Sequence, residues 1–335
     1  MSKFIDNKFL VFIFLFVLGV LTSFSLPPYN FFFINFLTFP LLFYILVKRI
    51  NKNFINNFLN GWFYGFGYFL SNLYWISNSL KFDENFENLI LISIILIPSL
   101  LSIFYGLFSL SLKLFNVRMN FSSILIFSLS LSIFEYLRGT LFGGFPWNLI
   151  SFSMLKMISS LQILSLIGTY SLNLLVITFF CLPVVILFKI SKIKKIKILF
   201  VAILILLFNS YYGYNKIQST EKIEKKTIFP SIKLVSPRFN IERFFVEEPI
   251  EKKINELIEI SYPLSKDLLL IYPEGITNNG ELNNLENDFS KNSLNLTNNT
   301  KIILGIAFDD GEKIFNSLAL FDKELKIEKN YYKNK

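Results

Sequence analysis

The chain has 335 residues, of which 53% are hydrophobic and 41 are phenylalanine, and it carries a formal net charge of +9. This apolar fraction excludes an ordinary soluble protein and predicts a membrane protein. Histidine is absent and Cys181 is the single cysteine, which excludes Ser-His-Asp triads, disulfide frameworks and thiolate metal clusters, so we expect no metal and no cofactor.

The positive charge is unevenly distributed. Residues 1–212 carry 15 Lys and Arg against 5 Asp and Glu, whereas residues 213–335 carry 18 against 19. The basic excess therefore belongs to the apolar part of the chain. Nucleic-acid binding needs a basic patch on an accessible domain, so we expect no nucleic-acid partner.

Uncharged apolar stretches follow one another from residue 9 to residue 215, and each is long enough for about one crossing of a ~30 Å hydrocarbon core. A Pro27-Pro28-Tyr29-Asn30 turn divides the first stretch into two spans. The stretches cover residues 9–47, 53–80, 88–112, 119–134, 157–188 and 198–215. The sequence therefore predicts seven membrane spans.

The basic residues between these spans predict the orientation of the chain. With the N-terminus in the cytoplasm, twelve Lys and Arg fall in cytoplasmic segments and three, Lys81, Arg138 and Lys156, fall in outer loops. Cytoplasmic loops of membrane proteins carry the excess of Lys and Arg. Seven crossings then deliver everything after about Tyr214 to the far side of the membrane.

Two membrane stretches contain glycine, aromatic or charged residues at specific spacings in addition to their apolar residues. In residues 61–76, glycines four residues apart with aromatic residues at both ends favour close helix packing and an interfacial aromatic belt. In the second stretch, Glu135 and Arg138 are three residues apart, a spacing that lets them pair on one helix face. Ionisable groups at membrane depth are functional candidates. The glycine-rich and aromatic loop that follows, with Trp147, could re-enter the headgroup layer and hold a lipid.

From residue 223 the pattern changes to strands alternating with helices. Residues 232–235 and 268–271 read as strands, and residues 248–262 as a helix with one apolar stripe. Residues 301–306 and 314–321 predict a hairpin around an Asp309-Asp310-Gly311 turn. An Asn-rich stretch over residues 278–299 is expected to lie outside the core.

Glu274 follows the predicted strand at residues 268–271. Pro273 cannot donate a hydrogen bond to a sheet ladder, so the strand must end there. Glu274 is therefore expected at the mouth of a strand, where catalytic groups collect. A solvated turn glutamate is the alternative interpretation.

These motifs, in this order, resemble the apolipoprotein N-acyltransferase family, bacterial inner-membrane enzymes with a nitrilase-like domain on the periplasmic face. The resemblance rests on residues 61–76, 135–139, 144–147, 162 and 168–171, and on Tyr272-Pro273-Glu274, Phe315-Asn316-Ser317 and Tyr331-Tyr332-Lys333. It implies a multi-span α-helical membrane bundle, residues 1–212, followed by a partial α/β nitrilase-like (carbon-nitrogen hydrolase) domain, residues 223–335. The implied location is the inner membrane, with the C-terminal domain periplasmic.

The resemblance also implies a reaction, the phospholipid-dependent N-acylation of the N-terminal diacylglyceryl-cysteine of lipoproteins. A phospholipid is then the acyl donor and a diacylglyceryl lipoprotein the acceptor. A cysteine thiolate attacks the phospholipid ester, Glu274 acts as general base and Lys333 stabilises the oxyanion. Glu135, Arg138 and Trp147 are the candidate substrate-binding residues.

The sequence departs from the family pattern in two places. The family's cysteine lies beyond its Y-x-K motif, and Cys181 stands instead in an apolar stretch expected near the cytoplasmic side, so no nucleophile is assigned. Ser236-Pro237-Arg238 replaces the family's Q-x-N. We therefore expect a truncated or split-gene member whose 335 residues alone are inactive.

Three other functions remain as alternatives. The first is a catalytically inactive membrane protein that binds lipid or lipoprotein. A soluble-type amidase would need neither the spans nor a lipid-facing loop. A transporter would need ionisable groups or broken helices near the middle of the membrane, whereas the charges here cluster at the membrane edges.

Overall fold

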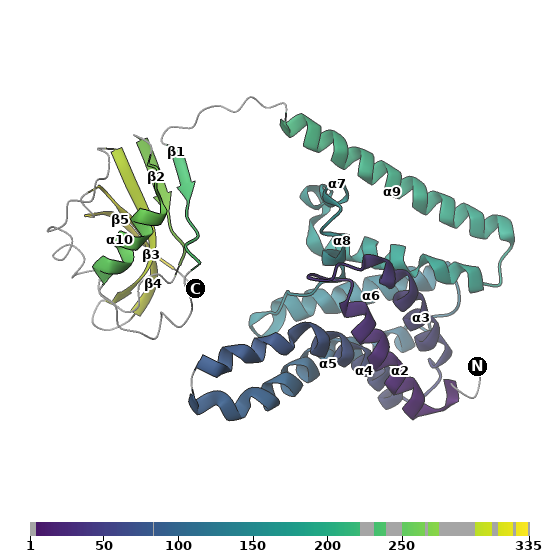
Figure 1. The fold of residues 1–335 in the computed structure, drawn as a ribbon. Coiled ribbons are helices and arrows are strands. Elements are labelled where there is room, and N and C mark those ends of the chain that lie inside the picture. The colour runs from purple at the N-terminus through teal and green to yellow at the C-terminus, as the bar shows by residue number, and fades with distance from the viewer. Residues whose placement is uncertain are drawn as a thin grey trace. The chain divides into compact units, whose positions relative to one another are not determined.

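The computed structural model describes residues 5–82, 84–221, 231–238, 250–264, 267–274, 299–309, 314–323 and 326–333. The chain forms two compact units, Met1–Ile223 and Glu224–Lys335, which are described separately (Figure 1). The predicted turn residues Asp310 and Gly311 and most of the Asn-rich stretch lie outside the described residues.

The first unit is helical. Its long helices are α2 (Lys8–Ser23), α3 (Asn35–Lys48), α4 (Phe54–Leu73), α5 (Ile90–Leu114), α6 (Phe121–Thr140), α8 (Leu164–Cys181) and α9 (Lys192–Glu221). Short helices join them: η1 (Phe32–Ile34), η2 (Tyr74–Phe82), η3 (Glu84–Leu89), η4 (Leu141–Gly143), η5 (Ile150–Met154), α7 (Ile158–Leu161) and η6 (Leu182–Leu187). Each long helix overlaps one of the predicted apolar stretches, although α6 extends beyond its stretch to Thr140 and α9 extends beyond both ends of its stretch.

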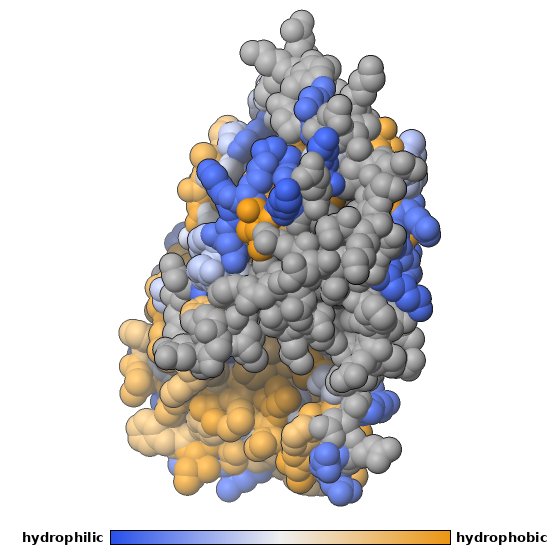
Figure 2. Space-filling view, turned by 90° about the vertical axis from the view of Figure 1, so that its left-hand side faces the viewer, coloured by the Kyte–Doolittle hydropathy of each residue, from blue (hydrophilic) through white to orange (hydrophobic). Residues whose placement is uncertain are grey.

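Four of these helical segments are long and apolar enough to cross a membrane. They are Asn85–Leu114, Phe121–Gly143, Leu164–Leu187 and Lys192–Thr220, and the helices Lys8–Ser23 and Phe32–Lys48 are apolar but shorter. Figure 2 shows a broad orange area of hydrophobic residues in the lower part of the view. The chain is therefore a membrane protein with several apolar helices, and the count of seven crossings stays a prediction.

Asparagine side chains begin three of the helices. Asn7, Asn53 and Asn120 each accept a hydrogen bond from the backbone N–H three residues later, over 3.2, 2.9 and 2.9 Å. These bonds satisfy N–H groups that have no partner inside the helix. The caps therefore define where α2, α4 and α6 begin.

Glycines let α4 pack closely against its neighbours on two sides. A Cβ atom at Gly61 would lie 2.1 Å from the carbonyl oxygen of Tyr105 in α5, and one at Gly67 would lie 2.1 Å from the carbonyl oxygen of Phe16 in α2. No side chain fits at either position. The predicted packing of this stretch through small residues is therefore confirmed.

The segment between α6 and α8 enters the helical bundle. Leu149 and Ile150 are buried, and the N–H of Ser151 donates to Oδ1 of Asn173 in α8 over 2.9 Å. On the other side, Nδ2 of Asn35 in α3 donates to the hydroxyl of Ser153 over 3.4 Å. The segment is therefore held between α3 and α8.

The second unit is a five-stranded sheet with the strands in chain order, β1 to β5. The strands are β1 (Ser231–Leu234), β2 (Asp267–Ile271), β3 (Asn299–Asp309), β4 (Ile314–Phe321) and β5 (Ile327–Tyr332). β1, β2 and β3 are parallel, while β4 and β5 are antiparallel to their neighbours. Helix α10 (Ile250–Ile260) contributes Leu257 and Ile258 to the core of this unit.

The four predicted strands and the predicted helix are found, with shifted ends. β5 was not predicted as a strand, and it carries the chain to Lys333. The coarse architecture is thus a helical membrane region followed by a small sheet region. The nitrilase-like assignment of the sheet region and the domain limits 1–212 and 223–335 stay predictions.

Candidate functional site

Glu274 lies where β2 leaves the sheet. The N–H of Tyr272 donates to the carbonyl of Ile303 over 3.0 Å, and Pro273 has no N–H to continue this ladder. The backbone of Glu274 then passes directly over β3, because a Cβ atom at Gly305 would lie only 2.8 Å from the Cα of Glu274. The Glu274 side chain is exposed. The predicted position at a strand mouth is confirmed, and its catalytic role stays a prediction.

Tyr272 fixes the end of β2 to helix α10. Its phenol oxygen lies 2.9 Å from the hydroxyl of Ser261 and also donates to the carbonyl of Leu257 over 3.3 Å. Burial raises the pKa of the Tyr272 phenol, and the hydrogen bond with Ser261 partly offsets that rise. The phenol is therefore neutral at physiological pH, and it holds the strand that precedes Glu274.

Asn316 in β4 contacts both predicted catalytic residues. Its Nδ2 donates to Oε1 of Glu274. Its backbone carbonyl accepts from the N–H of Lys333 over 2.9 Å. Lys333 follows directly after β5, and its side chain is exposed.

The packing beside Asn316 fixes how β4 and β5 pair, and so which residue of β5 lies opposite each residue of β4. Tyr332 pairs with Ser317 across the β4–β5 ladder, and its ring lies 5.4 Å from the ring of Phe315. The three motifs that contain Glu274, Asn316 and Lys333 therefore meet at one end of the sheet. Sequence reasoning gave Asn316 no role of its own, because a polar residue in a hairpin strand looks like any solvated side chain.

Cys181 lies at the end of α8 in the core of the first unit. Its side chain is buried, with no exposed surface. A substrate ester cannot reach an enclosed thiol. In the described part of the chain, no three His, Cys, Asp or Glu side chains come together to hold a metal ion.

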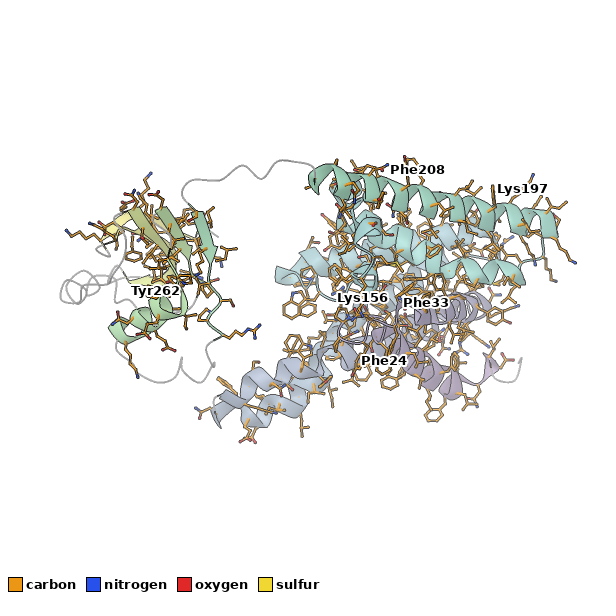
Figure 3. All side chains as sticks on the ribbon, turned by 45° about the horizontal axis from the view of Figure 1, so that its top comes forward. Phe24, Phe33, Lys156, Lys197, Phe208 and Tyr262 are labelled. Atoms are coloured by element: carbon orange, nitrogen blue, oxygen red, sulfur yellow. The ribbon has the colours of Figure 1, made fainter. Side chains whose placement is uncertain are left out.

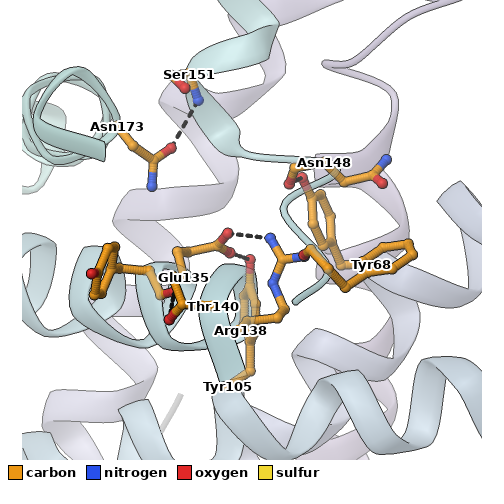
Figure 4. A network of polar contacts seen from close by, with 10 residues as sticks. Tyr68, Tyr105, Glu135, Arg138, Thr140, Asn148, Ser151 and Asn173 are labelled. Carbon is orange, nitrogen blue, oxygen red and sulfur yellow. Dashed lines mark hydrogen bonds and ion pairs between the residues drawn. The ribbon is translucent and has the colours of Figure 1, made fainter. Parts of the chain in front are cut away.

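Glu135 and Arg138, which both lie on α6, form a buried ion pair (Figure 4). Nη2 of Arg138 contacts Oε2 of Glu135, and the hydroxyl of Tyr105 in α5 donates to Oε1 of the same carboxylate. Both charged side chains have no exposed surface. The guanidinium also lies over the ring of Phe69 in α4, 5.1 Å from its centroid. The predicted pairing is confirmed.

Arg138 also holds the loop that carries Trp147. Its Nη1 donates to the carbonyl of Phe145, whose N–H donates back to the carbonyl of Arg138 over 2.8 Å. At the residue directly after Trp147, the hydroxyl of Tyr68 in α4 donates to the carbonyl of Asn148 over 2.7 Å (Figure 4). Helices α4 and α6 thus fix the loop from two sides.

Trp147 lies at the surface of this loop. It is 50% exposed, and its ring stacks on Trp75 with 5.7 Å between centroids. The side chains of Glu135 and Arg138 lie together beneath the loop and are not exposed. Of the three predicted substrate-binding residues, Trp147 alone is placed to touch a ligand.

The membrane region matches a known family. Residues 18–182 match the family model of the apolipoprotein N-acyltransferase N-terminal domain. This segment contains Glu135, Arg138 and Trp147, while Glu274 and Lys333 lie beyond it.

Individual relatives agree with this match. A protein of Rhodopseudomonas palustris named apolipoprotein N-acyltransferase is 33% identical over 172 residues, which cover 50% of this chain and 32% of that protein. One of Brucella melitensis is 28% identical over 176 residues, covering 50% of this chain and 33% of the relative. One of Rhizobium rhizogenes is 31% identical over 205 residues, covering 58% of this chain and 38% of the relative. The aligned part of the chain thus spans about a third of the length of these relatives.

Proposed function

Since the chain belongs to the apolipoprotein N-acyltransferase family through its membrane region, we propose that it takes part in the phospholipid-dependent N-acylation of lipoproteins. The observation that supports this reaction most directly is the contact of Asn316 with both Glu274 and Lys333. This contact supports the proposal because it brings Glu274 and the backbone of Lys333 to one end of one sheet, where the carboxylate would act as general base and the ammonium as the stabilising cation. These are the two groups that acyl transfer from an ester requires beside its nucleophile.

The proposed chemistry has two steps. Glu274 takes the proton of a thiol, the thiolate attacks the carbonyl carbon of a phospholipid ester, and the ammonium of Lys333 stabilises the oxyanion; the ester C–O bond then breaks, and the lysophospholipid leaves with the proton that Glu274 returns. The free α-amine of the diacylglyceryl-cysteine then attacks the thioester, an amide forms and the thiol is regenerated. Asn316 is a positioning residue, because its amide fixes the Glu274 carboxylate. We assign no nucleophile, since Cys181 is enclosed.

The membrane region has a supporting part in this proposal. The buried Glu135–Arg138 pair positions the loop, and Trp147 with Trp75 presents aromatic surface to a lipid headgroup or to the lipoprotein acceptor. We propose the inner membrane as the location and the periplasmic side for the sheet region, as the distribution of basic residues suggests.

The test is the acylation state of lipoproteins in cells depleted of their own N-acyltransferase. The natural gene, with its flanking DNA, should restore triacylated N-termini detectable by mass spectrometry. Glu274→Gln should abolish them, and Cys181→Ala should leave them unchanged. Glu259→Gln, which changes an exposed glutamate of α10, is the matched control.

A second candidate is a membrane protein that binds lipid or lipoprotein without acyl transfer. The burial of Cys181 favours it for the 335 residues alone, which should leave lipoproteins diacylated. If the natural gene also leaves them diacylated while a lipoprotein co-purifies with the protein, the acyltransferase proposal is wrong and the binding function holds.

A further inference from the structure

A cavity of about 270 Å³ lies between α6, α8 and α9 in the first unit. Its size is near the lower end of the ~300–1,000 Å³ range of small-molecule sites. Aliphatic and aromatic side chains make almost the whole wall, and Ser160, Thr178 and Asn209 are its polar members. None of the Glu135, Arg138 and Trp147 network lines it. The cavity is therefore separate from the site described above.

Two contacts of α9 flank this cavity. Towards its C-terminal end, α9 presses against α7, because a Cβ atom at Gly213 would lie 1.7 Å from the carbonyl oxygen of Ser159. At its other end α9 packs against η6. Between these contacts Val201 and Ile205 line the cavity and are also exposed, as are Leu125 of α6 and Leu175 of α8. The cavity is thus open at the surface of the helical unit.

The opening lies at the depth of the hydrocarbon core. Residues 198–215 of α9 carry no charge and lie between Lys197 and Lys216. At ~1.5 Å per residue they span about 27 Å, close to the ~30 Å core. The cavity is lined by α9 from Ile198 to Asn209, so its neighbours are lipid tails. Figure 3 shows Lys197 near the start of α9, and Phe208 on its outer side.

Asn209 gives the cavity a specific polar group. Its Nδ2 donates to the carbonyl oxygen of Ser160 over 3.0 Å. A carbonyl can only accept, so this bond fixes the orientation of the amide. Oδ1 of Asn209 is then buried, and no residue that the structure describes donates a hydrogen bond to it. An occupant that satisfies this oxygen must bring a hydrogen-bond donor into the hydrocarbon layer.

We propose that this cavity binds a lysophospholipid, with its single acyl chain along α9 and its glycerol hydroxyl donating to Oδ1 of Asn209. A fully acylated phospholipid has no donor on its glycerol. Asn209 lies seven residues, or about 10 Å, from Lys216 towards the membrane centre. An ammonium headgroup stays in the polar layer, so it is not the donor at this depth. The site concerns binding alone and stands whether or not this chain transfers acyl groups.

Photolabelling of the full chain in nanodiscs tests the site. The probe is lysophosphatidylethanolamine with a diazirine near the end of its acyl chain, and mass spectrometry maps the label. We expect label on α8 and α9. Ala202→Phe fills the cavity and should lower that label at least about fivefold, whereas Ile203→Phe, at a neighbouring residue that is 53% exposed and does not line the cavity, should leave it unchanged. Equal labelling of both variants would overturn the proposal.

A second variant tests the hydroxyl contact. Asn209→Leu should weaken labelling by the lysophospholipid about fivefold, which corresponds to one lost hydrogen bond of ordinary strength. Labelling by phosphatidylethanolamine with the same photoreactive chain should be weaker in the unchanged protein and insensitive to Asn209→Leu. If the two lipids label the unchanged protein equally, an ordinary bilayer chain fills the cavity and the proposal is wrong.

Discussion

The guanidinium of Arg138 touches three different parts of the membrane unit: its own helix at Glu135, the loop at Phe145 and the ring of Phe69. Removing one member of a buried ion pair leaves an uncompensated charge, which costs about 3–5 kcal/mol. We therefore predict that Arg138→Met lowers the free energy of unfolding in detergent by about that amount.

The double variant Glu135→Leu/Arg138→Met is the decisive comparison. It removes both charges, so it should be less destabilised than Arg138→Met alone. Thermal unfolding of the purified protein measures both. If the loss in the double variant equals the sum of the losses measured for Arg138→Met and for Glu135→Leu alone, the pair is not coupled and the loop is held by other contacts.

Gly305 is the residue that lets Glu274 pass over the sheet. Gly305→Ala would place a methyl group 2.8 Å from the Cα of Glu274, so the backbone must shift. We predict a loss of about 1–3 kcal/mol in stability. We also predict reduced lipoprotein acylation in the depleted-cell assay, because Glu274 moves relative to Asn316.

The matched control for this variant is Ala319→Gly, a change of one methyl group at a buried position of β4 away from Glu274. It should destabilise the sheet without lowering acylation per folded molecule. Normal acylation by Gly305→Ala would show that the position of Glu274 does not matter.

The sequence predicted the position of Glu274 because Pro273 has no N–H to donate to a sheet, and the strand must therefore end before it. It could not locate Asn316 as a contact of Glu274, since that contact depends on β4 lying beyond β3 in the sheet order. It also placed Glu135 and Arg138 on one helix face correctly. It could not show that Tyr105, thirty residues earlier, closes over them, because this requires the packing of α5 on α6.

Among the elements, α4 packs closely against two neighbouring helices through its glycines. We predict that Gly61→Leu forces α4 away from α5 and destabilises the helical unit by more than ordinary overpacking, which costs about 1–3 kcal/mol, because the clash is with backbone. Ser171→Leu, at an exposed position of α8, should be nearly neutral. Thermal unfolding in detergent compares them, and similar losses would contradict the packing argument.

Two elements show what the hydrophobic pattern of the sequence cannot predict. Residues 157–188 were expected as one span, but the structure divides them into α7, α8 and η6, with Gly168 at a φ of +74° inside α8. An apolar run has the same composition whether it is straight or broken. β5 was missed because its sequence, IEKNYY, is mostly polar and lies at an edge of the sheet.

For the whole molecule, the distribution of basic residues predicts the topology. Reporter fusions after Lys197 should be active in the cytoplasm, and fusions after Ile260 should be active outside it, because Lys and Arg resist translocation in short loops. A reporter after Asn116 in the α5–α6 connection is a useful control and should also be cytoplasmic. A Lys189–Lys197 segment on the outer side would refute the predicted orientation.

The sheet of the second unit has its strands in chain order, and this order has a consequence for synthesis. Each strand can join the outer edge of the strand made just before it, and none must be inserted between two that already pair. The parallel pairings of β1 with β2 and of β2 with β3 must close the long connections at residues 235–266 and 272–298, whereas the β3–β4 and β4–β5 pairings close short ones. The slow steps of assembly are therefore the two parallel pairings, and until β3 arrives the edge of β2 beside Leu268 and Leu270 is open to any other extended chain.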